Sequence, residues 1–152
     1  MLQVSRIGGI APRQPFARPE VSTIPRSSRR LLSLRYTTDL SAVRALVRYA
    51  AKEAGLSEMR SVDLEIAVSE IAANTLRHAH SAGLLEVWHD GHEVVCRLKD
   101  AGHIRDPLAG QRPPRPGALS GHGLWLVNQV CDEVDLQSGE NGTTIWVRMK
   151  LA

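Results

Sequence analysis

The sequence feature that most constrains the fold is LLEVWHDGHEVVCRLKD, residues 84–100, in which two runs of alternating apolar and polar residues flank Asp90 and Gly91. Alternation with a period of two predicts β-strands that each bury one face. Asp-Gly is favoured in two-residue type I′ turns because both central residues need a positive φ. The stretch therefore predicts a β-hairpin, and a chain built around it must cover one face of a sheet.

The residues before the hairpin predict a strand and a helix. "RRLLSLRYTT" alternates enough to form a first strand from Arg29. Asp39 or Ser41 can cap a helix that runs to about Ala54. Gly55 is expected to end this helix, because glycine adopts the left-handed conformation at little cost.

The remaining segments complete the predicted fold. A second helix is expected from the N-cap Ser57 to about His80. Residues 101–120 are rich in Pro, Gly and Arg without periodicity, which predicts a loop; residues 121–130 predict a short helix and residues 132–151 two strands. Helices gathered on one face of such strands make a two-layer α+β sandwich with a mixed, mostly antiparallel sheet.

Charge is distributed unevenly along the chain. The whole chain carries a formal charge of +3, and residues 1–30, with six Arg and one Glu, carry +5, so the rest carries −2. Direct nucleic-acid binding is therefore not expected, since it requires a basic folded face. Residues 1–29 hold four Pro and no sustained periodicity, which predicts a disordered basic tail before a domain at 30–152. An organelle transit peptide is an alternative that the missing amphipathic pattern disfavours.

Several kinds of protein and site are disfavoured by what the sequence lacks. No apolar run approaches the roughly 20 residues that span a bilayer, and no secretory signal is present, so we expect a cytoplasmic protein without a membrane contact. Cys96 and Cys131 lie apart in apolar surroundings, which predicts buried thiols. His89 and His92 have no third ligand nearby, which favours surface histidines. The dispersed tryptophans predict packing in the core or on a sheet face.

Within the second predicted helix, "SEIAANTLRHAH" places Glu70 and Asn74 four residues apart, as neighbours on one flank of the apolar stripe. By position alone, the pair belongs to a solvated helix edge. Its chemistry suggests more, because a carboxylate can deprotonate a nucleophile. An amide oxygen one turn away is a hard ligand that suits Mg²⁺ bound to phosphates.

Three further motifs follow along the chain. "LKDAGH" puts Asp100 at the end of a strand, with Gly102 where the backbone must turn closely. "SGHGLWLV" puts Gly121 and Gly123 before a helix, whose free N–H groups can meet phosphate. "NGTTIWV" puts Gly142 and two Thr at the start of the last strand. Each motif is weak alone, and no G-x-x-x-x-G-K-[ST] motif occurs, so any nucleotide site must be of another kind.

In this order, E-x-x-x-N on a helix, D-x-G after a strand, G-x-G-L before a helix and G-T into a strand resemble the GHKL ATPase family. The Bergerat fold of that family is shared by gyrase, MutL and histidine kinases. The small size and the form "SEIAANTLRHA" resemble most the anti-sigma-factor serine kinases of the RsbW and SpoIIAB type. The resemblance covers about residues 30–151 and implies a histidine kinase-like ATPase domain that uses ATP and Mg²⁺.

The resemblance also implies a role for each matching residue. Glu70 is the expected general base that activates a serine hydroxyl, and Asn74 is the expected Mg²⁺ ligand. Asp100 is expected to accept a hydrogen bond from the adenine amino group. Residues 103–120 would be the ATP lid. The other expected nucleotide-binding residues are His78, Gly102, Gly121, His122, Gly123, Leu124, Thr143 and Thr144.

The function implied is an anti-sigma factor and serine/threonine kinase of a bacterial partner-switching system. Its expected partners are a STAS-domain anti-anti-sigma factor, which it phosphorylates, and a sigma factor, which it sequesters. Because relatives of this type often pair, a homodimer is a further expectation.

Two departures from the family pattern keep an alternative open. His103 and Ile104 follow Gly102 where many relatives have a second glycine, and the predicted lid holds four Pro. These departures favour a non-catalytic module of the same fold, which holds ATP or no nucleotide and acts by protein contact. An ATPase module of a gyrase-like or chaperone-like machine is disfavoured, because those proteins need a transducer domain.

Overall fold

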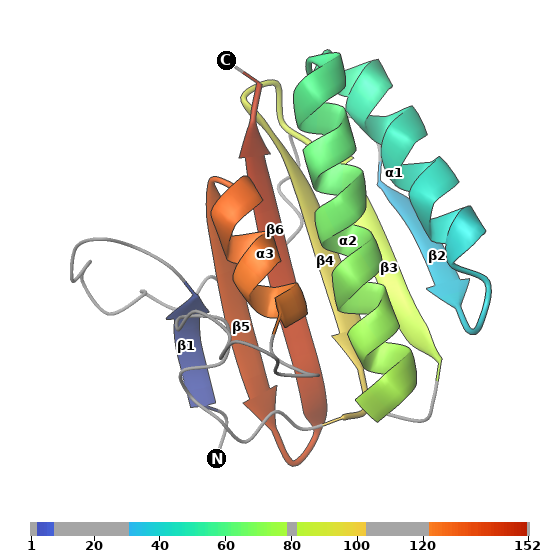
Figure 1. The fold of residues 1–152 in the computed structure, drawn as a ribbon, viewed down its shortest axis with the longest axis vertical. Helices are drawn as coiled ribbons and strands as arrows, with labels where there is room; N and C mark the ends of the chain where they lie inside the picture. The colour runs from blue at the N-terminus through green and yellow to red at the C-terminus, as the bar shows by residue number, and fades with distance from the viewer. Residues whose placement is uncertain (1–2, 8–30, 79–81, 103–121, 152) are drawn as a thin grey trace.

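The computed structural model describes residues 3–7, 31–78, 82–102 and 122–151. These residues form a two-layer α+β sandwich, as predicted (Figure 1). The described elements are β1 Gln3–Ile7, β2 Leu32–Tyr36, α1 Leu40–Ala54, α2 Glu58–His78, β3 Gly83–His89, β4 Glu93–Asp100, α3 His122–Val130, β5 Glu133–Gly139 and β6 Gly142–Lys150. The strand order is β1-β5-β6-β4-β3-β2, and every described pair of neighbouring strands is antiparallel.

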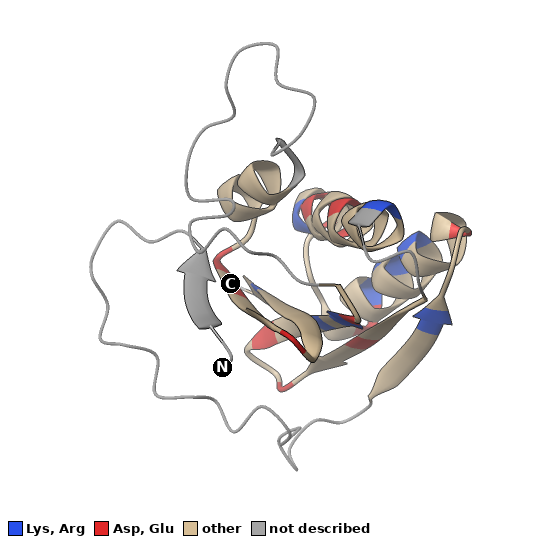
Figure 2. Cartoon of the chain, turned by 90° about the horizontal axis from the view of Figure 1, so that it is seen from below, with Lys and Arg blue, Asp and Glu red and all other residues tan. Residues whose placement is uncertain are grey.

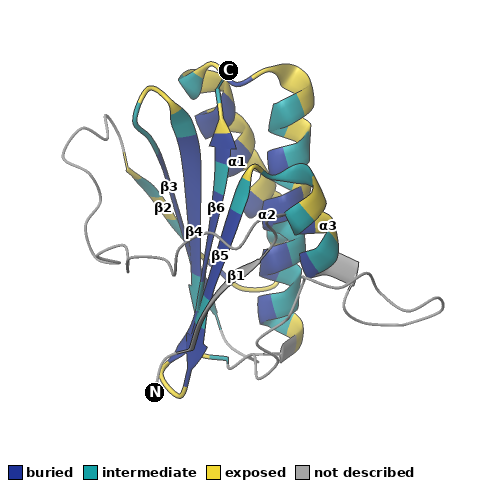
Figure 3. Cartoon of the chain, turned by 90° about the vertical axis from the view of Figure 1, so that its left-hand side faces the viewer, coloured by how far each residue is buried: buried dark blue, intermediate teal, exposed yellow. Residues whose placement is uncertain are grey.

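The described helices cover one face of the sheet and turn their buried sides toward it (Figure 3). The side chains that fill this interface come from α1, α2 and the central strands. Those that are fully buried include Val43, Val47, Leu64, Val68, Ile71, Leu85, Val94 and Met149. Burial of each such side chain contributes about 1.5–3 kcal/mol, so this single core stabilises both layers.

Helix α1 begins and ends at the residues that the sequence predicts. The carboxylate of Asp39 accepts a hydrogen bond from the backbone N–H of Ser41 at 3.0 Å. At the other end, Gly55 has a φ of +90°, its N–H donates to the carbonyl of Lys52, and the next N–H donates to the carbonyl of Ala51. These two bonds satisfy carbonyls that would otherwise lack a partner at the helix end.

Helix α2 carries the residues of greatest functional interest. The hydroxyl of Ser57 accepts a hydrogen bond from the N–H of Arg60 at 3.3 Å, which confirms the predicted cap. The described part of the helix ends at His78, and residues 79–81 lie outside the described residues. Gly83, which the sequence places at the end of the helical segment, instead starts β3 and pairs with Tyr36 of β2.

The β3–β4 hairpin differs from its prediction by one residue. The N–H of Asp90 donates to the carbonyl of Glu93, so the central residues of the turn are Gly91 and His92. The carboxylate of Asp90 accepts the N–H groups of both His92 and Glu93, which favours Asp at the first position of the turn. Gly91 supplies the positive φ, at +91°.

Residues 3–7 lie in the segment that the sequence predicts to be disordered, but they form strand β1 on the edge of β5. The four prolines of that segment all follow residue 11, so none interrupts β1. Without β1, the edge of β5 would have unpaired backbone N–H and C=O groups, and β1 forms hydrogen bonds with them. The composition of residues 1–29 gives no sign of this partner. The rest of the predicted tail lies outside the described residues.

The opposite face of the sheet holds a second, smaller cluster made by Trp88, Val95 and Trp146. The guanidinium of Arg97 lies 5.3 Å from the ring centre of Trp88 and donates two hydrogen bonds to the carboxylate of Glu86, at 3.0 and 2.9 Å. The prediction of sheet-face tryptophans is confirmed for Trp88 and Trp146. Basic and acidic positions occur together on the described helices and strands (Figure 2).

Candidate functional site

Three strand ends bring polar side chains together at one end of the sheet. Asp100, the last residue of β4, lies opposite Thr143 of β6, and Thr143 lies opposite Ser138 of β5. Helix α2 ends over the same end of the sheet, the lower end in Figure 1, and contributes Thr75. We call Asp100, Gly102, Ser138, Thr143 and Thr75 the Asp100 corner.

Both carboxylate oxygens of Asp100 accept hydrogen bonds from the protein. The hydroxyl of Thr75 donates to Oδ2 at 2.9 Å, and the backbone N–H of Gly102 donates to Oδ1 at 2.7 Å. Hydrogen bonds of this kind favour the ionised carboxylate. They also fix its plane, so Asp100 is a preorganised hydrogen-bond acceptor.

A second set of hydrogen bonds fixes the backbone after Asp100. The hydroxyl of Thr143 donates to the carbonyl of Gly102 at 2.7 Å. Since this bond uses the one hydroxyl proton of Thr143, the hydroxyl of Ser138, 2.7 Å away, must donate to Thr143. These bonds tie the backbone at Gly102, directly before the predicted lid, to β5 and β6.

Gly142 allows β6 to approach the corner closely. Its φ is +119°, and a Cβ at this position would lie 2.3 Å from the backbone carbonyl oxygen of Asp100. The neighbouring Thr144 is not brought to the corner. Successive strand residues face opposite sides of a sheet, so Thr144 shares the helix-free face with Trp146, which belongs to the smaller cluster there.

Glu70 and Asn74 lie half-buried on α2, one turn apart. The side-chain oxygen of Asn74 accepts a hydrogen bond from Arg77 at 2.6 Å. No group of three or more His, Cys, Asp or Glu side chains that could hold a metal exists among the described residues. Mg²⁺ commonly binds through one or two protein ligands together with phosphates and water, so Asn74 fits a nucleotide-bound Mg²⁺ provided that Arg77 moves aside.

The remaining predicted site residues are placed only in part. His122 and Gly123 are the first two residues of α3, so Gly123 lies inside the helix and not before it as predicted, and Leu124 is buried in the core. The side chains of His78 and His122 lie outside the described part of the chain. The same holds for Gly121 and for the predicted lid, residues 103–120.

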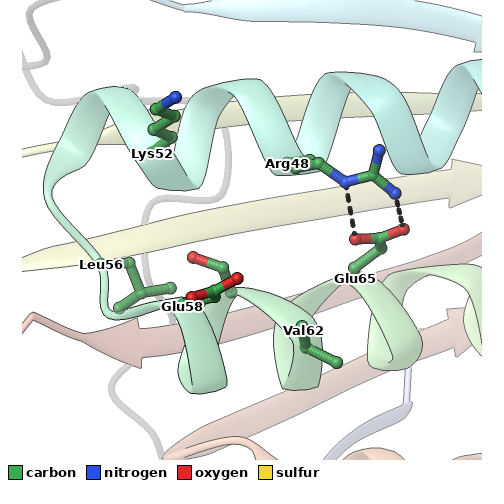
Figure 4. Close-up of a pocket in the computed structure, with 7 residues that line it drawn as sticks. Arg48, Lys52, Leu56, Glu58, Val62 and Glu65 are labelled. Atoms are coloured by element: carbon green, nitrogen blue, oxygen red, sulfur yellow. Dashed lines mark hydrogen bonds and ion pairs between the residues drawn. The ribbon is translucent and has the colours of Figure 1, made fainter.

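The outer surface between α1 and α2 has a hollow of about 450 Å³ (Figure 4). Arg48 of α1 spans it with two hydrogen bonds to Glu65 of α2, at 3.2 and 2.6 Å. Glu65 and Asn74 are nine residues apart, which places them on opposite flanks of the helix. The hollow is therefore not the predicted nucleotide site. An adjoining hollow extends along the same surface to Glu70, which is thus accessible from outside.

The two thiols do not offer a nucleophile. Burial raises the pKa of Cys96 above its ordinary value, and burial followed by the charge of Asp132 raises the pKa of Cys131 to about 12. Both thiols therefore stay protonated at neutral pH, and the thiolate is the reactive form. Cys96 is buried as the sequence predicts, whereas Cys131 is only half-buried against the core.

Three residues of the site were not predicted from the sequence: Tyr36, Thr75 and Ser138. Thr75 left a signal, because it continues the spacing of Val68 and Ile71 as a polar residue on an apolar stripe, and buried polar groups need partners. Thr75 is 3 % exposed, and its hydroxyl accepts a hydrogen bond from Tyr36 at 3.0 Å. Tyr36 and Ser138 left no local signal, since their roles depend on strand pairing.

Residues 33–149 match the family described as "Histidine kinase-like ATPase domain". The chain belongs to this family. The match spans all the described elements from β2 to β6, including the Asp100 corner and the Glu70–Asn74 pair. No individually curated protein matches the chain.

Among solved structures, the chain is similar to the crystal structure of the RsbU and RsbW domains of Rv1364c from Mycobacterium tuberculosis. The TM-score is 0.58 with 20% sequence identity, and the alignment covers 80% of this chain. It covers 32% of the solved chain, so this chain spans about a third of that chain's length. The similarity shows a shared fold. Among the described helices, none combines the length and apolar character needed to cross a membrane.

Proposed function

We propose that this chain binds Mg-ATP and transfers its γ-phosphoryl group to a serine or threonine of a STAS-domain anti-anti-sigma factor. In this proposal it also sequesters a sigma factor, as a cytoplasmic component of a bacterial partner-switching system, and it pairs as a homodimer. Membership of the histidine kinase-like ATPase family supports the nucleotide-binding part. The fold shared with a structure that contains an RsbW domain motivates the choice of partners.

The observation that carries the proposal is the fixed carboxylate of Asp100. An acceptor held at both oxygens, at the end of a sheet and beside a helix flank, suits recognition of an amino group on a planar base. Thr143 supports the same corner through Gly102. The proposed adenine-recognition carboxylate is bonded to Thr75, which directly follows Asn74 on α2 and lies five residues after Glu70.

The helix flank would perform the chemistry. When bound, Mg-ATP supplies the phosphoryl group and a cation that neutralises its charge. The carboxylate of Glu70 would take the proton of the substrate hydroxyl as its oxygen bonds to the γ-phosphorus and the bond to the β-phosphate oxygen breaks, which releases ADP. Asn74 would hold the Mg²⁺. Glu70 is half-buried, so part of its side chain is open to a hydroxyl on another protein.

One observation favours the non-catalytic alternative. The oxygen of Asn74 that would bind Mg²⁺ is bonded to a guanidinium at 2.6 Å. If Arg77 stays there when nucleotide is present, the chain would hold ATP without organising the metal. It would then act by protein contact alone.

The test is phosphotransfer with purified proteins. We expect label from Mg-[γ-³²P]ATP to appear on a STAS-domain protein of the same genome with the wild type, and not with Glu70→Gln. Glu65→Gln, on the opposite flank of α2, is the matched control and should transfer at the wild-type rate. ATP binding without transfer to any STAS-domain protein would support the non-catalytic alternative.

A further inference from the structure

Behind Asp100 lies a chain of buried hydroxyl groups that the site's chemistry does not yet use. The phenol of Tyr36, 2 % exposed, donates to the hydroxyl of Thr75 at 3.0 Å, and Thr75 contacts Oδ2 of Asp100 at 2.9 Å. Tyr36 comes from the edge strand β2, two strand positions away from β4, which carries Asp100, and Thr75 comes from α2. These hydrogen bonds therefore link the edge strand β2 to Asp100.

The direction of these hydrogen bonds follows from proton counting. Thr75 has one hydroxyl proton and accepts from Tyr36, so it donates either to Asp100 at 2.9 Å or to the carbonyl of Ile71 at 3.3 Å. The bond to the carboxylate is shorter, and bonds to charged acceptors are the stronger kind. Burial, partly offset by the Thr75 bond and aided by the charge of Asp100, raises the pKa of Tyr36 to about 12. Tyr36 thus keeps its proton throughout the physiological range.

The fold makes room for this arrangement at Gly83. A Cβ on Gly83 would lie 2.2 Å from the Tyr36 ring and hydroxyl, so the ring packs directly on the glycine backbone. This contact and the cross-strand pairing of Tyr36 with Gly83 hold the phenol in place. Tyr36 is therefore a fixed donor and not an adaptable one.

We propose that Tyr36 and Thr75 are positioning residues that hold Asp100 as an acceptor, and so set the preference for a purine with a 6-amino group over one with a 6-oxo group. The proposal rests on the proposed nucleotide binding. An oriented, ionised carboxylate accepts an N–H donor and repels a carbonyl oxygen. Without the Thr75 hydroxyl, Oδ2 of Asp100 loses a hydrogen bond that helps to fix the plane of the carboxylate.

The experiment compares Mg-ATP with Mg-ITP, which carries oxygen in place of the amino group, by calorimetric titration into the full chain. We expect the wild type to prefer ATP. Thr75→Val should weaken ATP binding about tenfold and ITP binding much less, since a hydrogen bond to a charged group accounts for a change of that order. Thr75→Ser, which keeps the hydroxyl, should restore the wild-type ratio.

Tyr36→Phe provides a second variant that keeps the ring on Gly83 and removes only the donor. It should reduce the ATP-to-ITP preference about threefold, as loss of a weaker, neutral bond would. Tyr49→Phe changes an exposed tyrosine and is the matched control. An unchanged ATP-to-ITP ratio in Thr75→Val, or an equal loss of both nucleotides, would overturn the positioning role. A wild type that binds neither nucleotide would instead overturn the proposed function.

Discussion

The two ends of the candidate site are built differently. At the Asp100 corner, residues from β4, β5, β6 and α2 are joined by hydrogen bonds of 2.7 to 2.9 Å, and Thr75, Ser138 and Thr143 are nearly inaccessible. On the helix flank, Glu70 and Asn74 are half-buried, and the described bond of Asn74 is to the exposed Arg77. One end is held by a network of buried hydrogen bonds, and the other is partly exposed.

This difference indicates a division of labour. A base is recognised by fixed donors and acceptors, and preorganisation reduces the entropy lost on binding. The reacting end must admit a metal, phosphates and a second protein, so its final geometry can depend on them. Binding and chemistry should therefore respond separately to mutation.

The largest expected effect is at Glu70. Glu70→Gln keeps the shape of the side chain and removes its ability to take a proton. Phosphotransfer should fall by about 10²- to 10⁴-fold, whereas the affinity for Mg-ATP should change less than about threefold. The transfer rate and the calorimetric affinity for Mg-ATP would be measured in parallel. Equal losses in both would contradict the separation of binding and chemistry between the two ends.

Gly142→Ala should damage the Asp100 corner directly. The new Cβ would meet the Asp100 carbonyl oxygen at 2.3 Å, on a residue with a φ of +119°. We expect the free energy of unfolding to fall by about 3 kcal/mol, together with loss of ATP binding. Gly91→Ala has a similar positive φ but no atom within 4 Å, so it should cost only about 1 kcal/mol. Equal losses of unfolding free energy in the two variants, measured by urea unfolding, would show that the contact between Gly142 and the Asp100 carbonyl is unimportant.

The pH dependence of stability should report Tyr36. Its pKa is raised to about 12 from an ordinary value of 10.0, so the folded state holds this proton more tightly than the unfolded state does. The part of the folding stability that comes from this difference in pKa is fully present below pH 10 and is lost as the pH rises from 10 to 12. Each pKa unit corresponds to about 1.4 kcal/mol, so the loss is on the order of 2 to 3 kcal/mol.

Tyr36→Phe should abolish this part of the alkaline loss in denaturant unfolding curves. Tyr49→Phe should keep it, since Tyr49 is 53 % exposed. The same alkaline slope in the wild type and in Tyr36→Phe would mean that Tyr36 titrates normally.

The smallest expected effect concerns Arg77. Removing its guanidinium frees the Asn74 oxygen, so Arg77→Ala should lower the Mg²⁺ concentration needed for half-maximal ATP binding by about threefold, as expected of an exposed contact. Arg35→Ala, an exposed arginine on β2, is the control. A higher Mg²⁺ requirement in Arg77→Ala would show that Arg77 assists binding instead of competing with the metal.

The elements with strong local patterns could be predicted from the sequence. The helix caps at Asp39 and Ser57 and the stop at Gly55 depend on neighbours a few residues away, and the structure has them as expected. Strand β1 could not be predicted, because its partner β5 lies more than 120 residues further along the chain. The hairpin turn was misplaced by one residue, because Asp90 acts through its side chain at the first turn position.

The candidate site shows the same limit. D-x-G after a strand and E-x-x-x-N on a helix, taken in order with the other motifs, indicate Asp100, Glu70 and Asn74. The same resemblance indicates Thr144 beside Thr143, but strand alternation turns Thr144 to the other face of the sheet. Tyr36 supports Asp100 through Thr75, a residue 39 positions away, and no local pattern encodes that contact.

The central claim is that the Asp100 corner recognises ATP independently of Glu70. Calorimetric titration of Mg-ATP into the wild type, Asp100→Asn and Glu70→Gln tests it most directly. We predict binding by the wild type, a loss of at least about tenfold in Asp100→Asn, and near wild-type affinity in Glu70→Gln. No binding by the wild type, or wild-type affinity in Asp100→Asn, would contradict the claim.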